Sequence, residues 1–218
     1  MANEIDICNA ALSILGEAAT IVSVKPSDGS EMAGLCARWY PMACRRLFEE
    51  HDWSFAQKRA RLSELTGVDA EIYGGEKCYG CPSDAVRIID LYELIDRNGQ
   101  SFESARELVY VDRNRWRIED NPGNDARMIV TNVDTAVAHY TAYLSSPALY
   151  PQYFVEPLVV LLASYLSGPL KRQSSASTEA ANLLRQYQAS LSAAKTIDAT
   201  FVRRPHASIP SSIHSRWV

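Results

Sequence analysis

The sequence predicts a mainly α protein: an antiparallel helical bundle with an inserted small antiparallel β region and an extended C-terminal arm. Apolar residues recur at helical spacing near both ends of the 218-residue chain. Between them, closely spaced glycine, proline and asparagine residues divide the chain into short β-prone runs. The expected domains are therefore a helical bundle over residues 1–68 and 146–200, a β region over 69–145, and an arm over 201–218.

The first expected helix runs from Asn3 to Leu15. Asn3 is a suitable N-cap, because its side chain can accept a hydrogen bond from a free N–H of the first turn. Gly16 is a suitable stop, because glycine adopts the left-handed conformation that often ends helices. The seam between them consists of Ile5, Cys8, Leu12 and Leu15.

A longer helix is expected within residues 27–55. Asp28 stands three residues before Glu31, the arrangement of an N-cap and a returning carboxylate. Pro41 falls inside this helix, where it should kink it or divide it in two. The apolar stripe consists of Met32, Leu35, Cys36, Trp39, Ala43 and Leu47.

Two further helices are expected in the last third of the chain. One begins after Pro151 and should stop at Gly168 and Pro169. The other covers residues 177–199 and has one apolar face, formed by Ala180, Leu183, Leu184, Tyr187, Leu191 and Ala194.

The β region has short β-prone runs between turn signals, which favours antiparallel strands. The residues Asp112-Arg113-Asn114-Arg115 are expected to form a hairpin tip between two of them. The runs cover residues 86–91, 108–111, 116–118, 128–131 and 136–144.

The arm differs in charge from the rest of the chain. Residues 201–218 contain three arginines and no acid, and removing them from the net charge of −4 leaves −7 for residues 1–200. Proline and serine disfavour a helix here. We expect the arm to bind a partner, with Phe201 and Trp217 as apolar anchors and Arg203, Arg204 and Arg216 paired with carboxylates.

Composition excludes several classes of protein. The acidic balance, with a pI near 5.6, argues against a general nucleic-acid binder. No uninterrupted apolar run is long enough to cross a membrane, and the acidic N-terminus lacks the pattern of a signal peptide. Five cysteines, an odd number, are simplest to explain by synthesis in a reducing cytoplasm.

Two groups of residues could carry chemistry. Cys78 and Cys81 form a Cys-x-x-Cys pair, but the sequence offers no second pair or histidines at zinc-ligand spacing. His51 is surrounded by Glu49, Glu50 and Asp52, which could form the acid–base cluster of a hydrolase or a solvated helix end. In both cases the structural interpretation is favoured, and we expect no catalytic, cofactor-binding or metal site.

The sequence does not decide the environment of two aromatic side chains in the β region, Trp116 and His139. Trp116 lies between Arg115 and Arg117, so it is either an exposed contact or a strand residue turned inward. His139 is expected to be a packed or hydrogen-bonded strand residue rather than a metal ligand.

Several segments together resemble the head-to-tail adaptor of short-tailed bacteriophages, the tail tubular protein A family. They are Asn9 to Gly16, Arg38-Trp39-Tyr40-Pro41, Arg45-Arg46-Leu47-Phe48, Trp53-Ser54-Phe55-Ala56, Tyr79 with Cys81 to Arg87, Tyr140-Thr141-Ala142-Tyr143, and Pro147 to Phe154. The resemblance implies a structural virion protein rather than an enzyme, located at the head–tail interface and made in the host cytoplasm.

The same resemblance implies the partners. Twelve adaptor subunits would form a ring between the portal protein and a tail nozzle protein of the tail tubular protein B type. Double-stranded DNA would pass through the channel as cargo, without a cofactor and without a membrane. Two alternatives remain open: a small hydrolase acting on peptidoglycan or glycan, and a generic helical interaction module.

Overall fold

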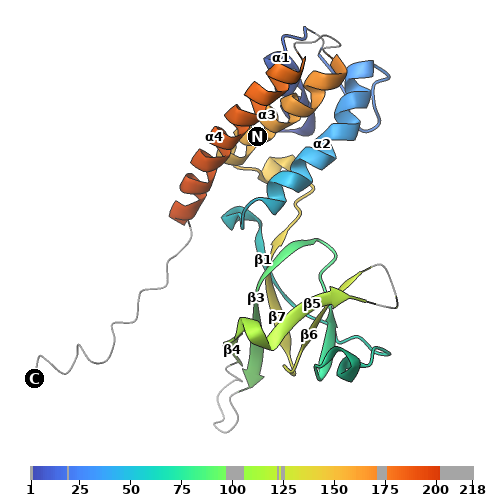
Figure 1. Ribbon diagram of the computed structural model, residues 1–218, viewed down its shortest axis with the longest axis vertical. Helices are drawn as coiled ribbons and strands as arrows, with labels where there is room; N and C mark the ends of the chain where they lie inside the picture. The colour runs from blue at the N-terminus through green and yellow to red at the C-terminus, as the bar shows by residue number, and fades with distance from the viewer. Residues whose placement is uncertain are drawn as a thin grey trace, which may run out of the picture.

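Figure 1 shows an elongated molecule with the helices gathered in one half and the strands in the other. This computed structural model describes residues 2–18, 20–96, 106–121, 123, 126–170 and 176–201. Helix accounts for 49% and strand for 24%, so the fold is mixed α/β and the prediction of a mainly α protein is wrong. The described helices are α1 (Glu4–Ile14), α2 (Glu31–Glu49), α3 (Gln152–Leu170) and α4 (Ala176–Phe201).

The helix ends follow from local hydrogen bonds. Asn3 caps α1 as expected, because its side chain accepts from the N–H of Asp6 at 2.7 Å. The N-cap of α2 is Ser30 rather than Asp28, and its hydroxyl accepts from the N–H of Ala33. Asp28 instead accepts from the N–H groups of Val22 and Ser30, which closes the preceding turn.

Two prolines do not end the helices in which they lie. Pro41 was expected to kink or divide α2; it does not divide the helix, which is continuous from Glu31 to Glu49. Pro169 was expected to stop α3, but that helix extends to Leu170. A proline near a helix C-terminus removes one hydrogen bond from the last turn, which the packing of the helix can offset.

Helix α3 is the central helix of the helical half. It packs against each of the other three helices, α1, α2 and α4. By length and composition α3 could cross a membrane, but 67% of its apolar window is buried inside the protein. Its apolar character therefore fits the core helix of a bundle.

The strands form two antiparallel sheets. The four-stranded sheet has the order β1-β7-β3-β4, and the three-stranded sheet has the order β2-β6-β5. Residues 57–65 join the sheets: β1 pairs with β7, and Glu64 then forms a bridge to Tyr79 of β2. The strands are β1 (Gln57–Arg61), β2 (Lys77–Gly80), β3 (Ala85–Asp96), β4 (Arg106–Val111), β5 (Trp116–Asp120), β6 (Arg127–Thr131) and β7 (Ala136–Ala142).

The strand content exceeds the expectation for two reasons. Strand β3 is 12 residues long, although only 86–91 was expected to be extended. Strand β1 begins at Gln57, inside the range that the sequence assigned to the helical domain, because pairing with β7 holds this segment extended. The residues Asp112 to Arg115 are not a hairpin tip, since the strands on either side, β4 and β5, belong to different sheets.

One apolar core runs through both halves. A continuous cluster of buried side chains extends from Ile7 of α1 and Leu161 of α3 to Leu91 of β3 and Trp116 of β5. A smaller cluster of Cys78, Met128 and Val130 lies under β2 and β6. The helical and β halves are therefore joined by packing as well as by the chain.

Candidate functional site

The two halves meet at a group of aromatic side chains, here called the junction cluster: Phe48, Trp53, Phe55, Tyr143, Tyr150 and Phe154. Phe154 lies at its centre, with ring centroids 4.8 Å from Phe48, 5.0 Å from Tyr150 and 5.1 Å from Trp53. The chain crosses between the halves at residues 50–56 and 143–151, and the cluster packs against both crossings.

Two polar atoms of the junction cluster donate hydrogen bonds to backbone carbonyl groups. The Trp53 Nε1–H donates to the carbonyl of Leu47 at 2.8 Å, and the Tyr150 hydroxyl donates to that of Leu144 at 2.6 Å. Burial raises the pKa of Tyr150, so this hydroxyl keeps its proton. These bonds hold the aromatic rings in fixed orientations.

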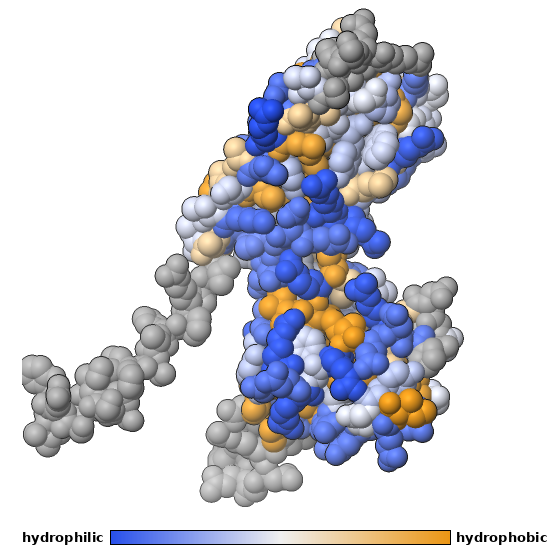
Figure 2. All heavy atoms as spheres, in the orientation of Figure 1, coloured by the Kyte–Doolittle hydropathy of each residue, from blue (hydrophilic) through white to orange (hydrophobic). Residues whose placement is uncertain are grey.

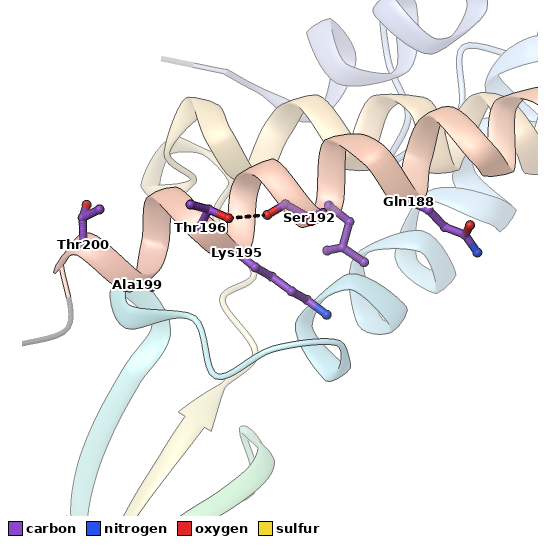
Figure 3. A pocket seen from close by; sticks show the side chains of 7 residues that line it. Gln188, Ser192, Lys195, Thr196, Ala199 and Thr200 are labelled. Atoms are coloured by element: carbon purple, nitrogen blue, oxygen red, sulfur yellow. Dashed lines mark hydrogen bonds between the residues drawn. The ribbon is translucent and has the colours of Figure 1, made fainter.

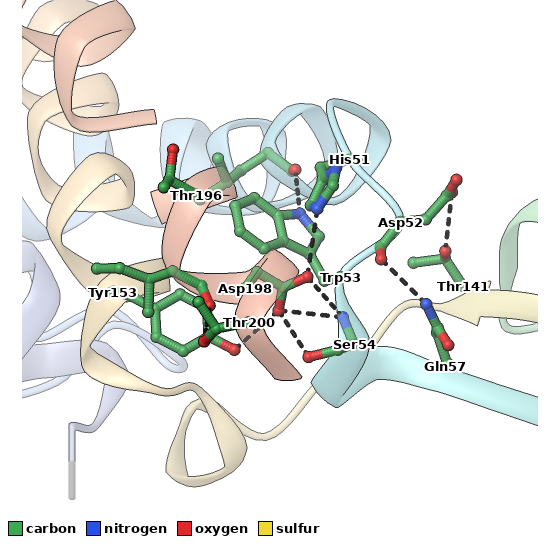
Figure 4. A network of polar contacts seen from close by, with 12 residues as sticks. His51, Asp52, Trp53, Ser54, Gln57, Thr141, Tyr153, Thr196, Asp198 and Thr200 are labelled. Atoms are coloured by element: carbon green, nitrogen blue, oxygen red, sulfur yellow. Dashed lines mark hydrogen bonds and ion pairs between the residues drawn. The ribbon is translucent and has the colours of Figure 1, made fainter. Parts of the chain in front are cut away.

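A fully buried carboxylate, Asp198, lies beside this cluster (Figure 4). It accepts hydrogen bonds from the N–H of Ser54 at 3.0 and 3.1 Å, from the Ser54 hydroxyl at 2.7 Å, and from the Tyr153 hydroxyl at 2.9 Å. His51 Nε2 lies 3.2 Å from Asp198 Oδ2, an ion-pair distance without hydrogen-bond geometry. Asp198 thus ties the end of α4 to the crossing at residues 51–54 and to α3.

Charged residues brace the junction from outside. Asp52 lies 3.1 Å from the Arg87 guanidinium of β3, and its carboxylate accepts from the Thr141 hydroxyl of β7 at 3.3 Å. Asp84 accepts from Lys58 at 2.8 Å and from the Tyr140 hydroxyl at 3.0 Å. Burial opposes the ionised form of Asp84, but the bonds from Lys58 and Tyr140 outweigh it and lower the pKa of this carboxyl.

The acidic residues around His51 face separate partners. Glu50 lies 3.8 Å from both Arg46 and Lys195, whereas Asp52 faces Arg87. His51 itself faces the buried Asp198. Within the described part of the chain, no three His, Cys, Asp or Glu side chains are placed to hold a metal ion.

The two cysteines of the Cys-x-x-Cys pair pack against different apolar clusters. Cys78 is buried in the smaller cluster under β2 and β6, while Cys81 packs against the main core. Burial raises the pKa of the Cys81 thiol to about 11 and also raises that of Cys78, so both stay protonated at neutral pH. All five cysteines are free.

The two aromatic positions left open by the sequence are now placed. Trp116 is turned inward, with 8% of its surface exposed and the Arg113 guanidinium 4.9 Å from the centre of its ring. His139 Nε2 lies 3.2 Å from the Gln57 side-chain oxygen, so it is a hydrogen-bonded strand residue.

The expected binding residues of the arm lie mostly beyond the described part of the chain. Phe201 is the last residue of α4; it is 66% exposed and stacks on Tyr153, with centroids 6.0 Å apart. Arg203, Arg204, Arg216 and Trp217 are outside the described residues. The arm therefore begins beside the site where Asp198 is buried.

An open groove of about 950 Å³ runs along α4 (Figure 3). One helix supplies all of its lining residues: Gln188, Leu191, Ser192, Lys195, Thr196, Ala199 and Thr200. The Thr196 hydroxyl donates a hydrogen bond to the carbonyl of Ser192, and the Lys195 ammonium lies 3.8 Å from the Glu50 carboxylate. Among the described residues that line this groove there is no carboxylate or imidazole, and the groove is open rather than enclosed.

Apolar side chains are exposed on both halves. Figure 2 shows a hydrophilic belt across the middle of this face and apolar patches on the β half beneath it. In the helical half, Val22 is 72% and Met42 55% exposed; in the β half, Ile72 is 76% and Tyr110 55% exposed. Single exposed apolar residues of this kind are common on protein surfaces.

Sequence reasoning missed Asp198, although a signal was present. Leu191, Ala194 and Asp198 follow one another at the i, i+3, i+7 spacing of a single helix face. All three are buried. An acid that continues an apolar stripe indicates a buried carboxylate with dedicated hydrogen-bond donors.

Comparison of the sequence with protein families and with curated proteins yields no assignment. No protein-family model matches the chain, and no curated protein matches its sequence.

Proposed function

We propose that this protein is a head-to-tail adaptor of a short-tailed bacteriophage, a ring subunit between the portal and the tail nozzle. One observation carries the proposal beyond the sequence resemblance. The residues that carry the resemblance, such as Trp53, Phe55 and Phe154, belong to the junction cluster. They serve to join two halves of the molecule rather than to form a reactive centre.

A mechanical role suits this joint. The core is continuous between the halves, and Asp198 and Asp52 add polar ties across the crossings. Such a subunit can hold two partners at a fixed relative position, because tightly packed interiors have low compressibility. The proposed function has no turnover and needs no cofactor.

The charge of the chain supports passage of DNA through the ring. With −7 on residues 1–200, the subunit repels the phosphate backbone or binds it only weakly. A translocating duplex would therefore not be held by the wall.

The proposed partners are the portal protein, a nozzle protein of the tail tubular protein B type, and neighbouring subunits in a ring of twelve. Exposed apolar residues on both halves provide surfaces for two of these contacts. Arm residues Phe201, Arg203, Arg204, Arg216 and Trp217 supply a further binding element, with arginines that complement the acidic body. The proposed location is the head–tail interface of the virion.

Deletion of the gene from the phage tests this function. DNA-filled or leaky heads that carry a portal but lack the nozzle are expected, and the purified protein should restore tails when added to them. Complete tails assembled without the protein would contradict the proposal.

A further inference from the structure

The two edge strands of the four-stranded sheet, β1 and β4, differ in the polarity of their exposed side chains. Strand β1, at one margin, has the exposed residues Lys58, Arg59 and Arg61, which discourage pairing with another strand. Strand β4, at the other margin, has Leu108 and Val109 each 40% exposed and Tyr110 55% exposed. An apolar edge strand is a template for an added strand.

The strand register assigns these residues to two faces. Tyr110 lies opposite Tyr92, with ring centroids 6.0 Å apart, and Leu108 lies opposite Leu94 on the same face. Val109 lies opposite Glu93, so an apolar residue and a carboxylate share the other face. A strand that fits this edge needs large apolar residues on the first face and a cation on the second.

The end of the arm has this pattern. Residues 211–218 contain no proline and are long enough for the six residues of β4. Ile213, Ser215 and Trp217 would point to one side of a strand. His214 and Arg216 would point to the other.

We propose that residues 211–218 of one copy add as a strand to β4 of a neighbouring copy. Ile213 and Trp217 lie on the face of Leu108 and Tyr110, and Arg216 lies on the face of Glu93. This inference rests on the proposed ring of subunits and names the acceptor site of the arm.

An arginine on an added strand can reach across its neighbour. Within the same sheet, Arg59 of β1 extends across β7 to Tyr92 of β3, with its guanidinium 5.0 Å from the ring centre. Arg216 on a strand beside β4 stands in the same relation to Glu93 of β3, one strand further in.

The acceptor is taken to be a neighbouring copy because the proposed ring places subunits side by side, with each arm starting at the end of α4. Figure 1 shows α4 running obliquely and ending to one side of the β half. Tyr153 and Asp198 hold this end in place. Donation of an arm to the next copy is a head-to-tail contact, which closes into a ring under rotational symmetry.

A peptide titration tests the acceptor site. The receptor is the full-length chain with Trp217→Ser and Arg216→Glu, which leaves β4 free; the probe is a fluorescent peptide of residues 205–218. We expect saturable binding that Tyr110→Lys weakens at least tenfold. Ile72→Lys is the matched control, since Ile72 is 76% exposed in the short helix η2 (Ala70–Tyr73) outside the sheets. Equal binding by the Tyr110→Lys and Ile72→Lys receptors would overturn the site.

Hydrogen exchange tests the mode of binding. Slower exchange of β4 amides in the presence of the peptide is expected, because an added strand pairs with the free edge. Binding that leaves β4 exchange unchanged would overturn strand addition.

A mixture of two full-length variants tests whether the arm of one copy binds β4 of another copy. The donor has Tyr110→Lys and an intact arm, and the acceptor has the disabled arm and an intact β4. Each alone should remain monomeric in sedimentation, while the mixture should form a complex. Protection of β4 in isolated wild-type monomers without such a complex would place the arm on its own chain and overturn the proposal. None of these assays contains a portal, so their failure is distinguishable from failure of the adaptor function.

Discussion

Replacing Asp198 by alanine should destabilise the protein by about 3–5 kcal/mol, because hydrogen bonds to a fully buried carboxylate are lost. The substitution removes the acceptor of three donors: the N–H and hydroxyl of Ser54 and the hydroxyl of Tyr153. Each bond to a charged acceptor contributes about 1.5–3 kcal/mol, and relief of the buried charge offsets part of the sum.

Urea unfolding followed by tryptophan fluorescence measures this loss. The midpoint should fall while the slope stays constant, because the surface exposed on unfolding hardly changes. Asp198→Asn keeps the shape of the side chain and should lose less, which covers the case that the alanine variant does not fold. Asp134→Ala is the matched control, since Asp134 is 84% exposed in its ion pair with Lys77, and it should cost less than about 1 kcal/mol. A loss within about 1 kcal/mol for Asp198→Ala would refute the structural role of this carboxylate.

Three further predictions use the same unfolding assay. Burial and the bond to Asp198 raise the pKa of Tyr153 to about 12 from its usual 10, so stability should fall as the pH rises through this window. Tyr153→Phe should make that fall shallower, and an unchanged pH profile would contradict the shift. Phe154→Ala should cost about 3–5 kcal/mol through a cavity in the junction cluster; a cost below about 1 kcal/mol would mean that this cluster does not hold the halves together. Gly75→Ala should cost about 1–3 kcal/mol, because its Cβ would lie 2.5 Å from Val130 Cγ1; wild-type stability would show that β6 yields freely.

Local signals in the sequence were sufficient to place the four described helices, but not all of their ends. The cap at Asn3 and most of the apolar face of α4 depend on neighbours within a few residues. The cap is found, and Leu183, Tyr187, Leu191 and Ala194 are buried as expected, whereas Leu184 is 37% exposed. The end of α3 was placed slightly too early, because Pro169 lies within the last turn of the helix rather than after it.

The proportion of helix and strand could not be predicted from such local signals. Strand β1 consists of Gln57-Lys58-Arg59-Ala60-Arg61, which has no β propensity of its own and is extended because it pairs with β7. The turn after β4 leads into another sheet, and that pairing is decided by distant segments. Asp198 was missed for a related reason, since its main partner, Ser54, is 144 residues away in the chain.

The measurement that tests the adaptor proposal most directly is binding of the purified protein to a purified portal ring from the same phage, followed by particle imaging. Full-length protein and residues 1–200 would be compared side by side. We predict a saturable ring of the full-length protein on one face of the portal, weakened or lost without the arm. A full-length protein that leaves the portal bare at every concentration would contradict the adaptor function.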